Sequence, residues 1–351
     1  MTYFFNTKLV ALTVFTALFI NTLTAQNKEE MHVACVGFYN VENLFDTIDH
    51  ANVRDWEYTP DGKNKWNYAK YTEKLKNLSI VINDMAKETT PDGVAILGVS
   101  EVENKGVLED LVKEPLIKDR KYEIVHYDSP DRRGIDVALL YQSKYFKIKN
   151  SVSHKLIFED KPDYLSRDQL VVTGDLLNEE VSIIVCHWPS RSGGQLASET
   201  RRIQAAKLSR QIIDSLFSIN PKAKIILLGD LNDDPINKSL KNYLIAKGNQ
   251  SKVKDGMLFN PMFAIYKEGI GSLAWGNSWY LFDQILVTKS FLGTDYTSLK
   301  YYKATVFNKP YMLQSEGRYK GYPKRTTAGG KYLGGYSDHL PVYLTLLKYL
   351  K

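Results

Sequence analysis

The strongest constraint on the fold comes from an apolar segment that stops abruptly at acidic and amide residues. Residues 225–228 are all Ile or Leu, and the sequence Gly229-Asp230-Leu231-Asn232 follows them. A short apolar run bounded by turn residues predicts a buried β-strand. Asp230 and Asn232 are two residues apart, so in extended backbone their side chains point to the same side. They can bind a hard cation or a phosphate-bound water, or they can form a polar turn.

Other apolar segments divide the chain into strands and helices. Segments rich in Val, Ile, Leu and aromatic residues predict strands at 33–38, 93–99, 122–127, 135–141, 146–158, 167–177, 181–186 and 281–287. Apolar residues at helical spacing predict helices at 67–87, 105–114 and 197–217, and Pro235 opens a short helix. Arg201, Arg202 and Lys207 are predicted on the outer face of the third helix. The absence of a repeat, a low-complexity tract or a convincing linker indicates one domain over residues 26–351.

Polar side chains gather at the tips of the predicted strands. Four follow a strand, namely Asn40, Glu101, His187 and Asp230, and three open a strand, namely Asp283, Asp338 and His339. If the later strands run antiparallel to the earlier ones, all of these groups meet at one edge. Because burying unpaired charge is costly, packing alone does not explain such a set. A metal–phosphate site does.

The N-terminus has the pattern of a secretory signal. Lys8 precedes an apolar run from Leu9 to Ile20. A run of about 12 residues is too short to span a bilayer, which needs about 20. We therefore interpret residues 1–25 as a signal peptide. The mature protein is expected to be exported to the periplasm or beyond the cell, without stable membrane insertion, and to be a monomer.

Charge and cysteine content constrain the partners and the compartment only weakly. The formal net charge of +6 allows a polyanionic partner without requiring one. A loop from Arg318 to Lys331 interleaves basic residues with Tyr, a composition that suits contact with phosphates and bases. Export permits a disulfide between Cys35 and Cys186. Since both lie in apolar strand-like segments, we expect buried, unpaired thiols.

Six segments resemble the motifs of the endonuclease/exonuclease/phosphatase superfamily, in the same order along the chain. They are Tyr39-Asn40-Val41-Glu42, Ser100-Glu101-Val102-Glu103, Cys186-His187-Trp188, Gly229-Asp230-Leu231-Asn232, Phe282-Asp283-Gln284-Ile285 and Ser337-Asp338-His339. They cover almost the whole mature chain. The resemblance implies an α/β (α+β) fold, a four-layer α/β/β/α sandwich of two mixed β-sheets with helices on the outer faces. It also implies an active site at one edge, between the sheets.

The resemblance implies a role for each of these residues. The metal ligands would be Glu101, as the primary ligand of Mg²⁺, with Asn40, Asp338 and Glu42; Mn²⁺ or Ca²⁺ are alternatives, and a plain loop glutamate is an alternative for Glu42. The catalytic groups would be His187, Asp230, Asn232, Asp283 and His339. The substrate contacts would be Arg133, Arg167 and Trp188, although a solvated surface residue is an equal alternative for each arginine.

Within the catalytic set, Asp230 would orient or deprotonate the attacking water, and Asn232 would hold a phosphate oxygen. His339 would donate to the scissile phosphate, with Asp283 fixing its ring. Either the His339–Asp283 pair or Asp230 would be the base. His187 would lie on the leaving-group side, as a proton donor or as a phosphate contact.

The fold alone does not determine the substrate. The first hypothesis is a Mg²⁺-dependent phosphodiesterase that acts as a nuclease on DNA or RNA with little sequence specificity. The alternative is a phosphodiesterase or phosphatase that acts on lipid or inositol phosphates, as sphingomyelinases do. A non-catalytic binding protein with a decayed site is a third class, and the intact polar set argues against it.

Overall fold

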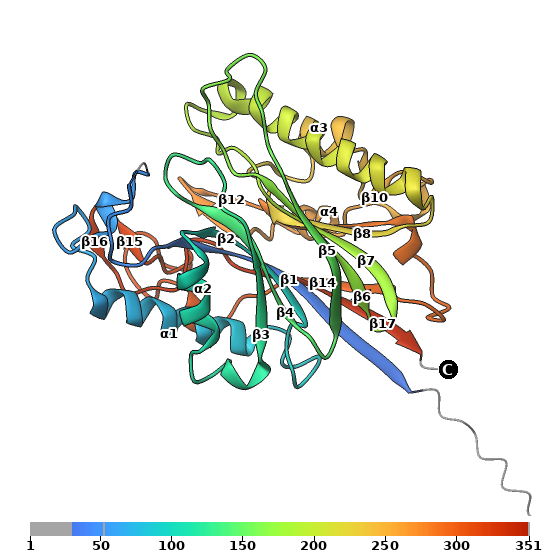
Figure 1. Ribbon diagram of the computed structural model, residues 1–351, viewed down its shortest axis with the longest axis horizontal. Helices are drawn as coiled ribbons and strands as arrows, with labels where there is room; N and C mark the ends of the chain where they lie inside the picture. The colour runs from blue at the N-terminus through green and yellow to red at the C-terminus, as the bar shows by residue number, and fades with distance from the viewer. Residues whose placement is uncertain (1–29, 52, 350–351) are drawn as a thin grey trace, which may run out of the picture.

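Two large mixed β-sheets packed face to face form the centre of the molecule (Figure 1). The computed structural model describes residues 30–51 and 53–349, so the predicted signal peptide lies outside the described residues. Within the described part of the chain, no helix combines the length and the apolar character needed to cross a membrane.

The first sheet has six strands in the order β14-β17-β1-β2-β4-β3. Their bounds are Met31–Leu44 for β1, Ile96–Val102 for β2, Tyr122–His126 for β3, Asp136–Gln142 for β4, Lys300–Val306 for β14 and Val342–Tyr349 for β17. Strands β1 and β2 are parallel, and the other neighbours are antiparallel.

The second sheet has seven strands in the order β5-β6-β7-β8-β13-β10-β9. Their bounds are Phe146–His154 for β5, Gln169–Leu176 for β6, Glu179–His187 for β7, Lys224–Asp230 for β8, Ala246–Lys247 for β9, Leu258–Phe259 for β10 and Asp283–Thr288 for β13. Two small hairpins pair β11 (Leu273–Trp275) with β12 (Ser278–Tyr280), and β15 (Thr327–Ala328) with β16 (Lys331–Tyr332).

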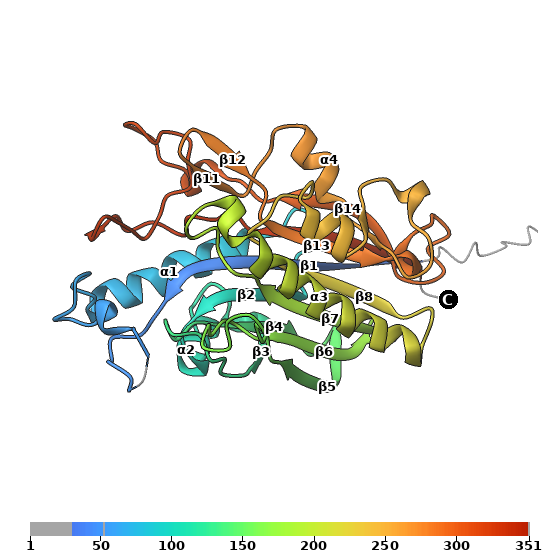
Figure 2. The ribbon, with the colours of Figure 1, turned by 90° about the horizontal axis from the view of Figure 1, so that it is seen from above.

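Helices cover the outer faces of both sheets, as Figure 2 shows from above. Helices α1 (Tyr68–Asp84) and α2 (Lys105–Val112) cover the first sheet, and α3 (Gln195–Ile219) covers the second. The short α4 (Met262–Lys267) packs against β13. Single 3₁₀ turns span Trp56–Tyr58, Lys118–Arg120, Gln250–Lys252, Lys289–Phe291 and Pro310–Met312.

The prediction that a short helix begins at Pro235 is wrong. A turn closed by Asn237 N–H and Asp234 C=O comes first, and a π-type turn begins only at Ser239.

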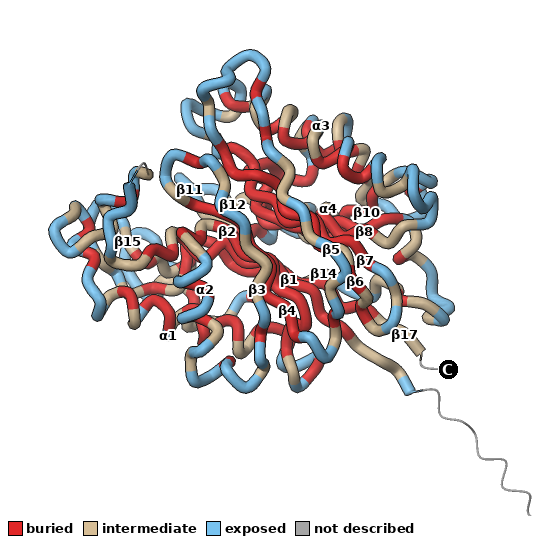
Figure 3. The backbone as a smooth tube through the Cα atoms, viewed as in Figure 1, coloured by how far each residue is buried: buried red, intermediate tan, exposed pale blue. Residues whose placement is uncertain are grey.

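The alternation of side chains along the strands produces three apolar layers. On β1, Val36 and Phe38 face the second sheet, whereas Cys35 and Tyr39 face the helices. On β8, Leu228 likewise points between the sheets. Figure 3 shows that the buried residues follow the strands and the inner sides of the helices. The four-layer sandwich is therefore confirmed.

The strand directions bring the predicted polar tips to one edge. Strand β13 is antiparallel to β8, with Asp283 directly opposite Asp230. Strand β17 is antiparallel to β1, and Val342 pairs with Phe38. The residues just before Val342 therefore lie beside the residues that follow Phe38 on β1. The parallel pair β7·β8 places His187 beside Asp230.

Both cysteines are buried and unpaired, as predicted. Burial raises the pKa of the Cys35 thiol to about 11 and that of Cys186 to about 12. Both thiols are therefore protonated and unreactive at neutral pH.

At the opposite edge from the polar tips, an ion-pair cluster joins the two sheets. Glu179, at the start of β7, accepts from Lys348 Nζ of β17 at 2.8 Å and from Lys224 at the start of β8. Burial of the Glu179 carboxylate opposes its ionisation. The hydrogen bonds from Lys224 and Lys348 outweigh this effect and hold the pKa of Glu179 below its usual value.

Replacing Glu179 by Gln is expected to lower the free energy of unfolding by about 1.5–3 kcal/mol at pH 7, because two ammonium groups lose an ionised acceptor. The pKa of Glu179 is lower in the folded chain than its usual 4.5. Its contribution is therefore complete above pH 4.5 and is lost as pH falls through the folded value. Urea unfolding should show a difference between the variant and the unchanged protein that shrinks from pH 7 to pH 3.

The matched control is Glu180→Gln, because the Glu180 side chain is 58% exposed on the same strand. This control should change the unfolding free energy little at either pH. A Glu179→Gln penalty that is the same at pH 7 and pH 3 would show that ionisation of Glu179 does not stabilise the sheet junction.

Candidate active site

Asp230 is the centre of the polar cluster at the sheet edge. Its Oδ2 accepts a hydrogen bond from Asn40 Nδ2 at 3.1 Å, which joins β8 of the second sheet to β1 of the first. The same Oδ2 lies 3.6 Å from His187 Nε2 and 3.8 Å from His339 Nε2. Its Oδ1 accepts from Asn232 N–H. Burial raises the pKa of Asp230 to about 7.

His339 is held by a chain of hydrogen bonds on its far side. Its Nδ1 lies 2.7 Å from Asp283 Oδ2, and Ser272 Oγ donates to the same oxygen. Burial alone would lower the pKa of His339, but the carboxylates of Asp283 and Asp230 outweigh burial and hold it well above the usual value. His339 is thus an imidazolium at neutral pH, with Nε2–H directed toward Asp230.

His187, in contrast to His339, is neutral at neutral pH. Its Nε2 lies 3.9 Å from Glu101 Oε1 in addition to its contact with Asp230. Burial, together with the positive charges of Arg167 and Arg133, holds the pKa of His187 well below the usual value. At neutral pH the site therefore holds one cationic imidazole, His339, and one neutral imidazole, His187, and the two can take different roles in catalysis.

Glu101 is the carboxylate with the most freedom to bind a cation. Its Oε2 accepts from Asn43 N–H at 3.1 Å. Its Oε1 makes no hydrogen bond to the described residues and lies 3.9 Å from Arg133 Nη1. The Arg133 side chain is 46% exposed, so its guanidinium can also reach a bound anion.

The backbone around Glu101 is irregular in a way that aims its side chain. Both β1 and β2 carry a register shift at the facing positions 40–44 and 100–102. Glu42, Asn43 and Glu101 have φ values of 49°, 52° and 62°, a left-handed region that side-chain-bearing residues adopt only at a cost. Such bulges re-aim side chains beside active sites.

Glu42 and Asp338 belong to a partly buried charge network beside Glu101. Arg325 Nη2 lies 2.7 Å from Asp338 Oδ2 and its Nε lies 3.6 Å from Glu42 Oε1. Burial and the neighbouring Asp338 raise the pKa of Glu42 to about 7. Lys74 Nζ of α1 enters the same network through Thr326 Oγ1 and the Tyr336 carbonyl, and burial lowers its pKa to about 8. Glu42 is only 3% exposed and also accepts from Thr326 N–H, so it is placed to hold the network together.

Two of the predicted substrate contacts are buried. The Trp188 side chain is fully buried beneath α3, and its backbone carbonyl accepts from Asn232 Nδ2 at 3.0 Å. Arg167 is 4% exposed, bonds to Asp131 at 2.9 Å and donates to the same Trp188 carbonyl. A substrate contact does not fit either position, because the Trp188 side chain is buried and the Arg167 guanidinium is taken up by Asp131 and the Trp188 carbonyl. Arg133 alone among the three stays accessible.

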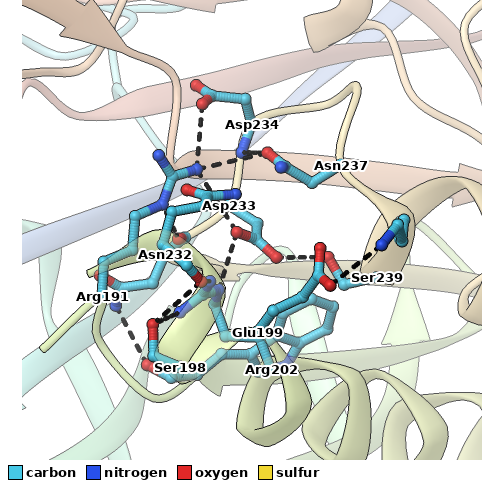
Figure 4. A network of polar contacts seen from close by, with 12 residues as sticks. Arg191, Ser198, Glu199, Arg202, Asn232, Asp233, Asp234, Asn237 and Ser239 are labelled. Atoms are coloured by element: carbon cyan, nitrogen blue, oxygen red, sulfur yellow. Dashed lines mark hydrogen bonds and ion pairs between the residues drawn. The ribbon is translucent and has the colours of Figure 1, made fainter. Parts of the chain in front are cut away.

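A second charge network fixes the turn after Asp230 and Asn232 (Figure 4). Arg202 Nε of α3 lies 2.7 Å from Asp233 Oδ1, and both side chains are almost fully buried. Arg191 Nη2 reaches Asp234 Oδ2 at 3.0 Å, and Arg191 Nε donates to the Asn232 carbonyl. The predicted outward orientation of Arg202 is therefore wrong. The inner face of α3 is lined with small residues, which leaves room for a guanidinium that pairs with Asp233.

The structure thus brings together nearly all of the predicted site. Asn40, Glu101, His187, Asp230, Asn232, Asp283, Asp338 and His339 lie at one edge. Sequence reasoning did not single out Lys74, Ser272 or Arg325. Arg325 was part of the predicted basic loop, but Lys74 resembles any polar residue between the apolar positions of a helix, and no local pattern distinguishes it.

The donor set fits a hard divalent cation. Glu101 offers a free carboxylate oxygen, and Asp338, Asn40 and Asp230 supply further oxygens nearby, the ligand type that such cations prefer. In the closely grouped trio of Asp230, Asp283 and His339, Asp283 is not free to bind a cation, because His339 Nδ1 and Ser272 already occupy its Oδ2.

The comparisons with known proteins agree with this geometry. The sequence matches the model of the Endonuclease/Exonuclease/phosphatase family over residues 35–348. No curated protein matches it. TDP2 from D. rerio, complexed with a single strand DNA product, aligns with a TM-score of 0.54 and 13% identity over 90% of this chain and 98% of that chain.

Two further structures share the fold. A mannosyl-6-phosphatase from Bacteroides thetaiotaomicron aligns with a TM-score of 0.53 and 15% identity over 89% of this chain and 99% of that chain. The human Nocturnin catalytic domain aligns with a TM-score of 0.51 and 15% identity over 92% and 97%. The chain belongs to the endonuclease/exonuclease/phosphatase family. It is a metal-dependent hydrolase of phosphate esters.

Replacing Arg202 by Met is expected to lower the free energy of unfolding by about 3 kcal/mol, because Asp233 is left buried with fewer partners. This is the low end for a broken buried pair, since Arg191 and Ser239 still contact Asp233. Chemical denaturation measures the loss, and Lys207→Met, on the exposed face of the same helix, is the control. Equal effects of the two substitutions would contradict the assigned role of Arg202.

Proposed function

We propose that this protein is an exported, Mg²⁺-dependent nuclease that hydrolyses phosphodiester bonds of DNA or RNA with little sequence specificity. The observation that carries the proposal is a pocket of about 340 Å³ that adjoins the site. Its lining includes Trp275, Arg318, Tyr319, Tyr322, Arg325 and Asp338. The last two also belong to the charge network beside Glu101.

The pocket has the composition of a site for a planar ring next to a phosphate. Tyr319 is 55% exposed, and its ring lies 5.9 Å from that of Tyr322 and 5.7 Å from the Arg318 guanidinium. Aromatic faces stack on any base, and nearby cations attract the backbone, so such a surface favours nucleic acid without selecting a sequence. The pocket borders the catalytic edge, because Ala274 and Asp338 line it and their neighbours Leu273 and His339 pair with each other.

The chain's own side chains can perform the hydrolysis. His339, kept cationic by Asp283, donates from Nε2 to a phosphate oxygen as negative charge develops there. Asp230, with a pKa near neutrality, orients the attacking water and accepts its proton. His187, being neutral, contacts the phosphate without supplying charge. A Mg²⁺ ion held by Glu101 would neutralise phosphate charge.

Two further observations support export and nucleic acid as the partner. Residues 1–25 have the composition of a signal peptide, and the formal net charge of the chain is +6. The same fold in D. rerio TDP2 accommodates a single strand DNA product.

A lipid-directed phosphodiesterase is the second candidate. Trp275 lies at the tip of the β11–β12 hairpin and is 68% exposed. An exposed aromatic tip of this kind suits insertion into a membrane interface, as in a sphingomyelinase-like enzyme.

The two candidates differ in their products. The protein from residue 26 onward is incubated with supercoiled plasmid, RNA, sphingomyelin vesicles or inositol phosphates, with Mg²⁺ or with chelator. We expect Mg²⁺-dependent strand cutting that chelator abolishes and that Glu101→Gln reduces by about 100-fold or more, in line with the loss of a positioned electrostatic contact. Release of phosphate or phosphocholine without strand cutting would favour the second candidate.

Two control variants sharpen this experiment. Glu109→Gln, at a half-exposed position on α2, should leave cutting unchanged. Tyr319→Ala should raise KM for a short oligonucleotide by about 10-fold, because stacking contributes about 1–3 kcal/mol per base. Tyr302→Ala, at an exposed tyrosine on β14, is its matched control. Equal KM values for both tyrosine variants would show that the pocket does not bind the bases.

A further inference from the structure

A second group of metal-type ligands joins the loop that follows β1 to Glu103, the first residue after β2, apart from the catalytic cluster. His50 Nδ1 lies 3.2 Å from Asp55 Oδ2 and 3.1 Å from Glu103 Oε1. Asp46, His50 and Glu103 each present a ligand atom, and these atoms lie within 4.8 Å of one another. Ligands at about 2.1 Å from one ion lie about 3.0–3.4 Å apart, so the distance between His50 Nδ1 and Glu103 Oε1 already suits a shared cation.

The carboxylates of this group lack the partners that burial requires. Asp55 is 1% exposed and Glu103 is 8% exposed. Within the described residues, Asp55 Oδ1 and Glu103 Oε1 accept no hydrogen bond. The single N–H of a neutral or protonated Nδ1 cannot satisfy both facing carboxylates. Three carboxylates around one imidazole leave more acceptor oxygens than N–H donors, and a buried oxygen without a donor is costly.

The backbone fixes these ligands before any ion binds. Asp46 N–H donates to Glu103 Oε2 at 2.7 Å, and Ile48 N–H donates to Asp46 Oδ1 at 2.7 Å. Asn104 Nδ2 donates to Asp46 Oδ2 at 3.3 Å. Hydrogen bonds of this kind orient ligands in metal sites. The His50 side chain is 43% exposed, which gives an ion a path from solvent.

A comparable group at His126, Asp128 and Asp136 differs in the hydrogen bonds and the exposure of its carboxylates. His126 Nε2 bonds to Asp136 at 2.9 Å, and the other Asp136 oxygen accepts from Ser129. The Asp128 side chain is 92% exposed and therefore hydrated. This group is satisfied by its own hydrogen bonds.

We propose that Asp46, His50 and Glu103, with Asp55 beside the His50 ring, bind a divalent transition-metal cation of the Zn²⁺ or Mn²⁺ type. An imidazole nitrogen beside carboxylates suits these ions, whereas Ca²⁺ and Mg²⁺ take oxygen ligands almost alone. The ion joins the loop between Asp46 and Asp55 to the end of β2, two residues beyond Glu101. It stabilises the strand end that carries Glu101, and it is separate from the catalytic cation. The proposal does not depend on the identity of the substrate.

The test uses Zn²⁺ as the only added metal and measures how much of it binds. Chelator-treated protein from residue 26 onward is titrated with Zn²⁺ by calorimetry, and bound zinc is counted by elemental analysis. His50→Ala and Asp55→Asn are each expected to remove one equivalent or to weaken it by about 100-fold or more, since even outer-shell changes cost about 10–100-fold. Glu101→Gln should retain that equivalent. Zn²⁺ should raise the Tm of Glu101→Gln but much less that of the double variant Glu101→Gln/His50→Ala, because His50→Ala alone keeps the catalytic cation site.

Two controls separate ligand loss from a loss of fold. His50→Gln keeps most of the side-chain volume at a partly exposed position. It must lose the same equivalent of bound zinc as His50→Ala does. His154→Ala removes a histidine on β5 outside the group and should bind zinc as the unchanged protein does. The proposal is overturned if folded His50→Ala and Asp55→Asn bind the same equivalents with the same affinity as the unchanged protein, or if Glu101→Gln binds none.

Discussion

The site depends on one contact between the two sheets, the hydrogen bond from Asn40 of β1 to Asp230 of β8. Asp230 is 2% exposed, and a buried carboxylate requires donors. It obtains them from the amide of the other sheet and from the backbone N–H of Asn232, and the two imidazoles lie 3.6 and 3.8 Å away. Because no single strand supplies these donors, the carboxylate is properly solvated only when both sheets are in register. Folding and assembly of the site are thus the same event.

The same requirement explains the irregular backbone at this edge. Regular strands would point Glu101 and Glu42 alternately into the apolar layers. The register shifts in β1 and β2, with positive φ at Glu42 and Glu101, turn these carboxylates toward the sheet edge instead. The cost of this conformation is offset by the hydrogen bonds that fix it, from Asn43 N–H to Glu101 and from Thr326 N–H to Glu42.

Sequence reasoning found the fold and most of the site because strand ends are visible locally. The run that ends at Asp230, and the pair Asp338-His339 before a strand, need only the apolar pattern and the strand direction to converge. What it missed depends on tertiary context. Trp188 follows a site histidine but points into the core, and Arg202 lies on the inner face of α3 because its partner Asp233 comes from a distant loop. Lys74 enters the site from a helix whose pattern gives no sign of it.

The two histidines show how the fold assigns chemistry to identical side chains. For His339 the carboxylates of Asp283 and Asp230 outweigh burial and raise its pKa. For His187 burial dominates, and the positive charges of Arg167 and Arg133 lower its pKa further. Arg167 therefore contributes to the electrostatics of the site from a buried position, without touching a substrate. Phosphate ester hydrolysis gains mainly from such preorganised charge.

A crystal structure with Mn²⁺ and inorganic phosphate tests the central claim most directly, because anomalous scattering locates the ion independently of the model of the chain. The account predicts an Mn²⁺ peak about 2.2 Å from Glu101 Oε1, and a phosphate oxygen within hydrogen-bond distance of His339 Nε2. No ion at Glu101, or a phosphate bound away from both Asp230 and His339, would contradict it.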